Sequence, residues 1–506
     1  MIPRLSRWEV AALLALLGGS ALHALYFDHI ADDAYISFRY AANLAEGNGL
    51  VFNPGEYVMG YSNFLWVVLL SGAEWLGVAS PRAAPVLGIV LGWGILALVA
   101  GYLRSAFGGS WPALSGALLL ATNGTFALWL VAGLEGPLFA LLLSASVVVA
   151  LRTEADAASR RFGWLGLLLG LAAITRPEGV FYGLVIGIGL WLRRPDRVRA
   201  RAVAGSLAIS LSIFGVFTAW AYAYYGDPLP NPYYTKFHPL SWELLMRGGR
   251  IALWFAMAYG GMPIVVLGAW LALCARRGSV GWLPFAICLA FVAFFVRVGG
   301  DGQAYYRMWF WVLPMLALLL GETVARLAGS SQRALHAWCV ALVALIAVSN
   351  LQHSVSGGEI ARVRHDETLS RDVGLIAVEL AEQHPGASVA ANNVGVLTYV
   401  SRLEVIDMLG LTDRHIATAP GKRVQFPAHE SHDGAYVLDR QPDIIFYGQP
   451  RAFRTPLDRD ELLAFGYPSD FDLRDDPRFL RDYALEHMRL DDGRYVPLFR
   501  RRVPSS

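Results

Sequence analysis

Charged residues are scarce in this chain of 506 residues, since Asp, Glu, Lys and Arg together make up only 16% of it. Soluble domains carry roughly 25% of such residues, and a soluble surface of this size cannot be covered with so few. Hydrophobic residues make up 55% of the chain, which excludes a disordered protein. The net charge of +2 gives no excess of basic residues that would indicate nucleic-acid binding. The composition therefore predicts a polytopic α-helical membrane protein.

Cysteine and the common cofactor motifs are also rare or missing. The three cysteines, Cys274, Cys288 and Cys339, fall inside apolar runs, which indicates packing residues and no disulfide framework. The sequence has no run of His and Cys with metal-ligand spacing, no Walker loop and no Gly-rich dinucleotide turn after a strand. We therefore do not expect a soluble nucleotide bound by a familiar loop.

Long apolar runs are abundant. A bilayer span needs about 20 apolar residues, or fewer where a helix is buried in a bundle. Eleven runs meet this description: 9–27, 84–103, 112–131, 137–151, 162–175, 180–192, 203–225, 249–273, 279–297, 306–327 and 334–351. We therefore expect about 11 transmembrane helices in a domain that covers residues 1–351.

The composition changes after this domain, where charges and histidines become frequent. Short strand-like pieces at 388–391, 404–408 and 443–447 alternate with helical ones such as 371–383. Residues 352–506 are therefore predicted to form a soluble α/β domain.

The arginine-rich loops predict the orientation of the chain, because basic loops stay on the cytoplasmic side. They fall on one side only if the apolar segment 62–77 does not cross the bilayer. We interpret this segment as an interfacial helix with Trp66 and Trp75 at the headgroup level. The first apolar run lacks a small-residue cleavage site and is interpreted as an uncleaved anchor. The expectation is a multi-pass protein of a bacterial plasma membrane with a cytoplasmic N-terminus and an extracytoplasmic C-terminal domain.

Two adjacent carboxylates, Asp32 and Asp33, open the first outer loop. If this loop is helical, Asp32, Tyr35 and Arg39 share one face. Two carboxylates at the end of a membrane span cost free energy unless they have partners or a function. The functional interpretation is a general base, or a ligand for a metal or a hydroxyl group. The alternative is an N-cap pair that satisfies the N–H groups at the start of its own helix.

The other outer loops combine turn residues, aromatic rings and isolated charges. Such loops suit a bound sugar or phosphate, but they equally suit ordered connections, ion pairs that bury charge and an aromatic belt at the membrane surface. The candidate substrate-contacting residues are Asn53, Glu56, Tyr61, Asn63, Glu135, Glu178, Asn231, Tyr233, Tyr234 and Asp301. The candidate cations beside them are Arg176, Lys236 and Arg307.

In combination and in this order, these segments resemble the GT-C superfamily of polyprenyl-phosphate-dependent glycosyltransferases, and more narrowly the mycobacterial terminal arabinofuranosyltransferases that cap arabinan. The segments that carry the resemblance are 32–40, 53–56, 60–63, 175–179, 226–231, 299–301 and 407–413. The sequence departs from the expected pattern in two places, at 231–236 and directly after Asp301. The chain is also shorter than the mycobacterial enzymes.

The resemblance implies a sugar donor linked to polyprenyl phosphate, with arabinofuranose as the sugar, and a cell-envelope glycan or glycoconjugate as the acceptor. Asp32 would act as the base, and Asp33 would contact sugar or a divalent cation. Tyr35 would join the substrate-contacting residues. The leaving lipid phosphate would be stabilised by Arg39, Arg176, Lys236 and Arg307.

Two alternatives stay open on the sequence. A related transferase would use another lipid-linked sugar, such as mannose or aminoarabinose, on protein or lipid A. A secondary transporter would place ionisable residues near the bilayer midplane and show repeated halves, and neither feature is evident in the sequence.

Overall fold

The computed structural model describes residues 6–153, 160–193, 195–236, 239–275, 279–329, 333–419 and 431–502. The chain divides into two compact units, and neither is continuous in sequence. The first unit combines Met1–His29, Ala84–Phe217 and His238–Val363, and the second combines Ile30–Ala83, Thr218–Phe237 and Arg364–Ser506. Two segments from the first half of the chain thus group with the C-terminal part. The domain boundary predicted after residue 351 stays a prediction.

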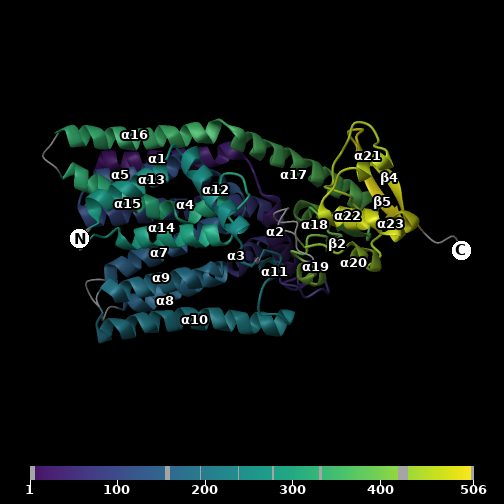
Figure 1. Cartoon of the computed structure of the whole chain (residues 1–506), viewed down its shortest axis with the longest axis horizontal. Coiled ribbons are helices and arrows are strands. Elements are labelled where there is room, and N and C mark those ends of the chain that lie inside the picture. Colours follow the sequence, from purple (N-terminus) through teal and green to yellow (C-terminus); the bar gives the residue numbers. More distant parts are fainter. Residues whose placement is uncertain are drawn as a thin grey trace. The chain divides into compact units, whose positions relative to one another are not determined.

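The first unit is built from helices, many of which run side by side (Figure 1). Two of its helices, α4 and α10, have one end in the second unit. The helices are α1 (Arg7–Phe27), α4 (Ser80–Phe107), α5 (Ser110–Thr122), α6 (Gly124–Val131), α7 (Gly136–Thr153), α8 (Arg161–Thr175), α9 (Glu178–Arg193), α10 (Arg197–Tyr225), α12 (Trp242–Ala258), α13 (Met262–Cys274), α14 (Trp282–Arg297), the 3₁₀ turn η1 (Arg307–Trp311), α15 (Leu313–Ala328) and α16 (Arg333–Val355).

Among the described residues, five helical segments are long and apolar enough to cross a membrane: α1, α4, α7, α10 and the stretch His336–Gln383. The count reaches seven if two bent pairs each form one span, α5 with α6 at 63° and α12 with α13 at 87°. Two other predicted spans, α8 and α14, are apolar but have only 15 and 16 residues. A multi-pass membrane protein fits these lengths, and the number eleven stays a prediction.

The bends occur where the sequence interrupts the helical hydrogen bonds. Asn123 ends α5, and its side chain accepts a hydrogen bond from the backbone N–H of Phe126 at 3.1 Å, which starts α6 in a new direction. Gly260 and Gly261 have φ values of 58° and 78° between α12 and α13, a conformation that glycine adopts at little cost.

The second unit contains a mixed five-stranded sheet, whose C-terminal strands are yellow in Figure 1. The strand order is β2-β1-β3-β5-β4, with β1 parallel to β2 and β3, and β5 antiparallel to β3 and β4. The strands are β1 (Ser388–Ala391), β2 (Glu404–Asp407), β3 (Ile444–Ile445), β4 (Tyr483–Arg489) and β5 (Tyr495–Arg501). The helices are α2 (Asp32–Ala45), α3 (Phe64–Trp75), α11 (Asn231–Lys236), most of α17 (Gly358–Gln383), α18 (Gly395–Ser401), α19 (Arg414–Thr418), α20 (Gly434–Asp439), α21 (Arg459–Leu463), α22 (Pro468–Asp475) and α23 (Pro477–Asp482).

Strands β1, β2 and β3 lie where the sequence predicted strand pieces, although β3 is shorter. The hairpin of β4 and β5 was not predicted. Its signal in the sequence is the turn 491–493 between two alternating stretches. In the structure, Gly493 of this turn has φ 86°. One apolar core cluster of this unit is formed by Ala390, Ile406 and Phe499 of the sheet together with residues of α19, α20, α22 and α23 such as Ile416, Val437, Leu473 and Phe479.

The interfacial segment forms α3, which belongs to the second unit. Trp75 is 77% exposed, whereas Trp66 is fully buried. The prediction that Trp66 lies at the lipid headgroups is therefore wrong, because protein encloses the ring on all sides.

Helices α4 and α6 approach each other closely at Gly88. A Cβ atom on Gly88 would lie 1.8 Å from the carbonyl oxygen of Leu130, and a backbone atom cannot move aside as a side chain can. Gly101 lies on the same helix and has open space around its Cα.

We expect Gly88→Ala to lower the free energy of unfolding by about 1–3 kcal/mol through overpacking, measured as a lower Tm in detergent. Gly101→Ala, the matched control on α4, should keep the wild-type Tm. Equal Tm values for the two variants would show that the contact between α4 and α6 does not limit stability.

Candidate functional site

The carboxylate of Asp32 accepts hydrogen bonds from the start of another helix. Helix α2 begins at Asp32, with Ala31 as its N-cap. The Oδ1 atom of Asp32 accepts the N–H of Val396 at 2.9 Å, and Oδ2 accepts the N–H of Gly395 at 3.3 Å. Gly395 and Val396 open α18, more than 360 residues further along the chain. Asp32 was considered as an N-cap of its own helix. That alternative is wrong, because its carboxylate accepts the first N–H groups of α18 and not those of α2.

Helices α2 and α18 pack against each other through aromatic rings. Tyr399 of α18 meets Tyr35 and Phe38 of α2 edge-on, with ring centroids 5.7 Å and 6.0 Å apart. Its hydroxyl donates to Glu74 of α3 at 2.9 Å. Tyr35, a predicted substrate contact, is therefore part of this packing and stays half-buried.

Burial raises the pKa of the Asp32 carboxyl to about 6. The N–H of Val396 opposes this rise, the negative charge of Asp33 adds to it, and the N–H of Gly395 opposes it. A carboxylate with a pKa close to neutral is well suited to accept a proton from a hydroxyl group near pH 7.

Arg39 is buried two turns along the same helix. Its Nε donates to the carbonyl oxygen of Phe52 at 3.1 Å, and one terminal nitrogen donates to that of Arg402 at 3.2 Å. Burial lowers the pKa of Arg39 to about 10, so it is still a cation at neutral pH. The guanidinium thus binds the carbonyl oxygens of Phe52 and of Arg402 at the end of α18. Its contact with phosphate stays a prediction.

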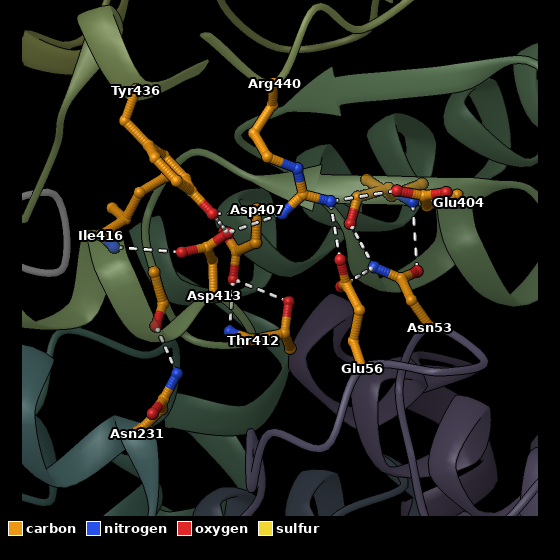
Figure 2. A network of polar contacts seen from close by, with 12 residues as sticks. Asn53, Glu56, Asn231, Glu404, Asp407, Thr412, Asp413, Ile416, Tyr436 and Arg440 are labelled. Carbon is orange, nitrogen blue, oxygen red and sulfur yellow. Dashed lines mark hydrogen bonds and ion pairs between the residues drawn. The ribbon is translucent and has the colours of Figure 1, made fainter.

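Asn53 pairs with the outer edge of strand β2, which has no neighbouring strand (Figure 2). Its Nδ2 donates to the carbonyl oxygen of Val405 at 3.0 Å, and its Oδ1 accepts the N–H of Val405 at 3.2 Å. Because β2 is an edge strand, these two backbone groups have no strand beside them. The amide replaces the missing strand and fastens the loop after α2 to the sheet.

Glu56, three residues later, extends this attachment (Figure 2). Its Oε1 pairs with Arg440 at 2.6 Å, and Arg440 also contacts Glu404 at 3.1 Å. The Oε2 of Glu56 accepts from Asn53 at 2.9 Å. Asn53 and Glu56 together therefore hold the loop after α2 against β2 and Arg440 through polar contacts.

Asn231 and the segment 407–413 complete the network in Figure 2. Asn231 donates to the carbonyl oxygen of Gly410 at 3.3 Å. Asp407 is buried and accepts the N–H groups of Leu409 at 2.9 Å and Thr412 at 2.8 Å. Asp413 caps α19 by accepting the N–H of Ile416 at 3.0 Å.

The remaining predicted residues of the second unit lie in two small groups. Tyr61 shares a hydrogen bond of 3.0 Å with the hydroxyl of Tyr225, and Asn63 donates to Ser37 at 3.0 Å. Tyr234 donates to Asp227 at 2.9 Å, next to Tyr233, whose side chain is 43% exposed. The side chain of Lys236 lies outside the described residues.

The other predicted charges belong to the first unit and form two ion-pair clusters. Arg176 lies between Glu135 and Glu178, at 2.9 Å from Glu178, and its guanidinium lies 4.4 Å from the centre of the Trp311 ring. Asp301 and Arg307 are paired at 2.9 Å. Both arginines thus have carboxylate partners, as the charge-burying alternative allowed.

No group of three His, Cys, Asp or Glu side chains with metal-ligating geometry occurs among the described residues. Both oxygens of Asp32 already accept an N–H group. The divalent cation considered at Asp32 and Asp33 stays a prediction, and no chemical step is assigned to it.

The partners missed by the sequence analysis are Gly395, Val396 and Arg440. Main-chain N–H groups carry no side-chain signature, and Arg440 is one of many arginines in a polar segment. The only local signal is the polar turn 392–393, which follows a strand and precedes a glycine.

The chain is similar to one protein family and to two known enzymes. Residues 360–496 match a family described as a domain of unknown function, DUF8728. The chain is 27% identical over 342 residues to the terminal β-(1→2)-arabinofuranosyltransferase of Corynebacterium glutamicum, covering 58% of this chain and 48% of the relative. It is 30% identical over 250 residues to the enzyme of the same name from Mycobacterium tuberculosis, covering 45% and 38%. The chain thus matches less than half the length of these relatives.

The fold is that of ArnT from Cupriavidus metallidurans. The crystal structure of ArnT with undecaprenyl phosphate superposes with a TM-score of 0.63 at 13% identity, covering 97% of this chain and 98% of ArnT. The apo form gives a TM-score of 0.61 at 14% identity. The predicted resemblance to GT-C glycosyltransferases, and to the terminal arabinofuranosyltransferases among them, is confirmed.

The attachment of the first loop to β2 can be tested at Asn53. We expect Asn53→Ala to lower the free energy of unfolding by roughly 2–4 kcal/mol, because the backbone N–H and C=O groups of Val405 lose their partners in a buried place. Thermal unfolding in detergent measures this as a lower Tm. Asn48→Ala, a change at an exposed position of the same loop, is the control. An unchanged Tm for Asn53→Ala would mean that water satisfies the strand edge equally well.

Proposed function

We propose that this chain, which has the fold of ArnT and is similar in sequence to the terminal arabinofuranosyltransferases, transfers arabinofuranose from a polyprenyl phosphate to a cell-envelope glycan or glycoconjugate. The transfer takes place on the outer side of the membrane, with the N-terminus in the cytoplasm. The observation that carries the proposal is the Asp32 carboxylate, which opens the first outer loop with a pKa raised to about 6 in a chain with these relatives.

The reaction makes one bond and breaks one. An acceptor hydroxyl attacks the anomeric carbon of the sugar, and its proton moves to Asp32. The bond from that carbon to the phosphate oxygen breaks, and the electron pair stays on the lipid phosphate. The cations Arg176, Arg307, Arg39 and Lys236 are the proposed stabilisers of this negative charge.

The remaining predicted residues are proposed to shape the site around the two substrates. Asn53, Glu56 and Asn231 act by holding the loops on the sheet, which their hydrogen bonds support. Tyr233, with 43% of its surface exposed, offers a ring face to a sugar. The isoprenoid tail of the donor lies among the apolar helices of the first unit.

The donor and the base are tested together by transfer of radiolabelled arabinofuranose from its polyprenyl phosphate to an arabinan acceptor, in membranes that contain the protein. We expect Asp32→Asn to reduce transfer by about 10²–10⁴-fold, the range for loss of a general base. Asp460→Asn, a change at a 91% exposed carboxylate of the second unit, is the matched control and should keep full activity.

Three outcomes would contradict this assignment in different ways. Transfer only from another lipid-linked sugar, such as mannose or aminoarabinose, would keep the reaction class and reject arabinofuranose. Full activity of Asp32→Asn would reject the base. Counterflow of a solute in proteoliposomes without sugar transfer would indicate a transporter.

The pH dependence of transfer follows from the pKa of Asp32. Only the ionised carboxylate accepts a proton, so the rate should rise with pH up to about 6 and level off above it. Asp33→Asn removes a like charge that raises the pKa of Asp32, so the acid limb should move to lower pH. Loss of activity at every pH in Asp33→Asn would instead show that Asp33 itself takes part in the reaction, as the base or as the contact to sugar or cation that the resemblance implies.

A further inference from the structure

Helix α18 is fixed along its whole length within the second unit. The turn before it is held by Asn392, which follows β1, donates to Asp470 at 3.0 Å and accepts from Ser469 at 2.7 Å. All three side chains are buried. The position of the first N–H groups of α18 is therefore set by the sheet and by α22.

The other end of α18 is held by α2 and α3. Arg39 donates to the carbonyl oxygen of Arg402, the residue that ends the helix. Tyr399 contacts Tyr35 and Phe38 through its ring and Glu74 through its hydroxyl. The helix thus has little freedom to rotate or slide relative to Asp32.

Gly395 permits the close approach at the start of α18. A Cβ atom at this position would lie 2.1 Å from the carbonyl oxygen of Asp32 and 2.9 Å from the carbon of its carboxyl group. No side chain of any size fits there unless the two helices separate. Only a glycine at this position lets two consecutive N–H groups reach one carboxylate.

We propose that Gly395 and Val396 are positioning residues for the Asp32 base, and that their backbone N–H groups aim its carboxylate and favour its ionised form. The inference rests on the proposed function of Asp32. It makes the segment from β1 to α18 a required part of the catalytic apparatus, although neither residue contributes a side chain to the chemistry.

The charges that surround Asp32 explain why such donors are needed. Burial and Asp33 both disfavour the ionised carboxylate. Tyr35 on the same helix, Tyr399 of α18 and Glu74 of α3 carry no positive charge. Arg402 is paired with Glu46 at 3.3 Å at the far end of the helix. Within this described neighbourhood, the two N–H groups are the contacts that lower the pKa of Asp32.

Two substitutions at residue 396 distinguish the effect of its N–H group from the effect of its side chain. Val396→Pro removes the N–H that donates at 2.9 Å but suits the first turn of a helix, whereas Val396→Ala keeps the N–H and shortens the side chain. We expect the acid limb of the transfer profile to move up by roughly one pH unit in Val396→Pro, since a hydrogen bond to a charged group is lost. In Val396→Ala it should stay in place. Equal midpoints in the two variants would overturn the proposal.

The glycine is tested with its own matched control. Gly395→Ala should reduce the plateau rate at least tenfold, because the two helices must separate and the carboxylate is no longer aimed. Gly374→Ala, on neighbouring α17, would place its Cβ 3.9 Å from the side chain of Val396, an ordinary contact, and should keep full activity. Wild-type kinetics in Gly395→Ala would also overturn the proposal.

A measurement without substrate distinguishes this inference from the proposed function. Only ionised Asp32 needs the second donor, so the difference in Tm between Val396→Ala and Val396→Pro should be small at pH 5 and widen above pH 6. The widening should disappear when both variants also carry Asp32→Asn. A widening that persists without the carboxylate, or no widening at all, would reject the inference. Absence of transfer in the wild type with the Tm pattern present would reject only the proposed function.

Discussion

The hydrogen bonds between the Asp32 carboxylate and the first N–H groups of α18 join the start of α2 to the helix that follows β1 of the C-terminal sheet. The loop returns to the same sheet at β2, where Asn53 occupies the strand edge and Glu56 meets Arg440. Asp32 lies at the start of the segment Ile30–Ala83 of this unit, so its hydrogen bonds and those of Asn53 hold the segment at two places. Under the proposed function, the Asp32 carboxylate keeps these hydrogen bonds and also accepts a proton.

These two demands on Asp32 oppose each other. Burial and a neighbouring negative charge raise its pKa to about 6, whereas main-chain donors lower it. Stronger donors would make the carboxylate a weaker base, and weaker ones would leave it protonated at neutral pH. The balance of the two effects, rather than either alone, gives a group that is ionised near pH 7 and still basic.

Most of the polar residues that the chain shares with the glycosyltransferase pattern are bonded to protein groups. Asn53, Glu56, Asn231 and Asp407 hold loops and strand ends together within the second unit, and Arg176 is held by two carboxylates in the first. Shared motifs of this kind therefore include residues that build the frame of a site as well as residues that contact substrate. Their substitution is expected to reduce stability and activity together.

The sequence by itself determined the membrane character, the order of the helices, the positions of β1 and β2, and the resemblance to glycosyltransferases, because composition, periodicity and short motifs are local properties. It did not determine that Asn53 binds β2, that Trp66 is enclosed by protein, or that Asp32 binds the start of α18. The two hydrogen bonds join residues more than 350 positions apart, and each involves a main-chain N–H group, which almost every residue has. Only the tertiary structure brings such groups within hydrogen-bond distance and thereby decides which carboxylate is bonded to main-chain N–H groups and has a raised pKa.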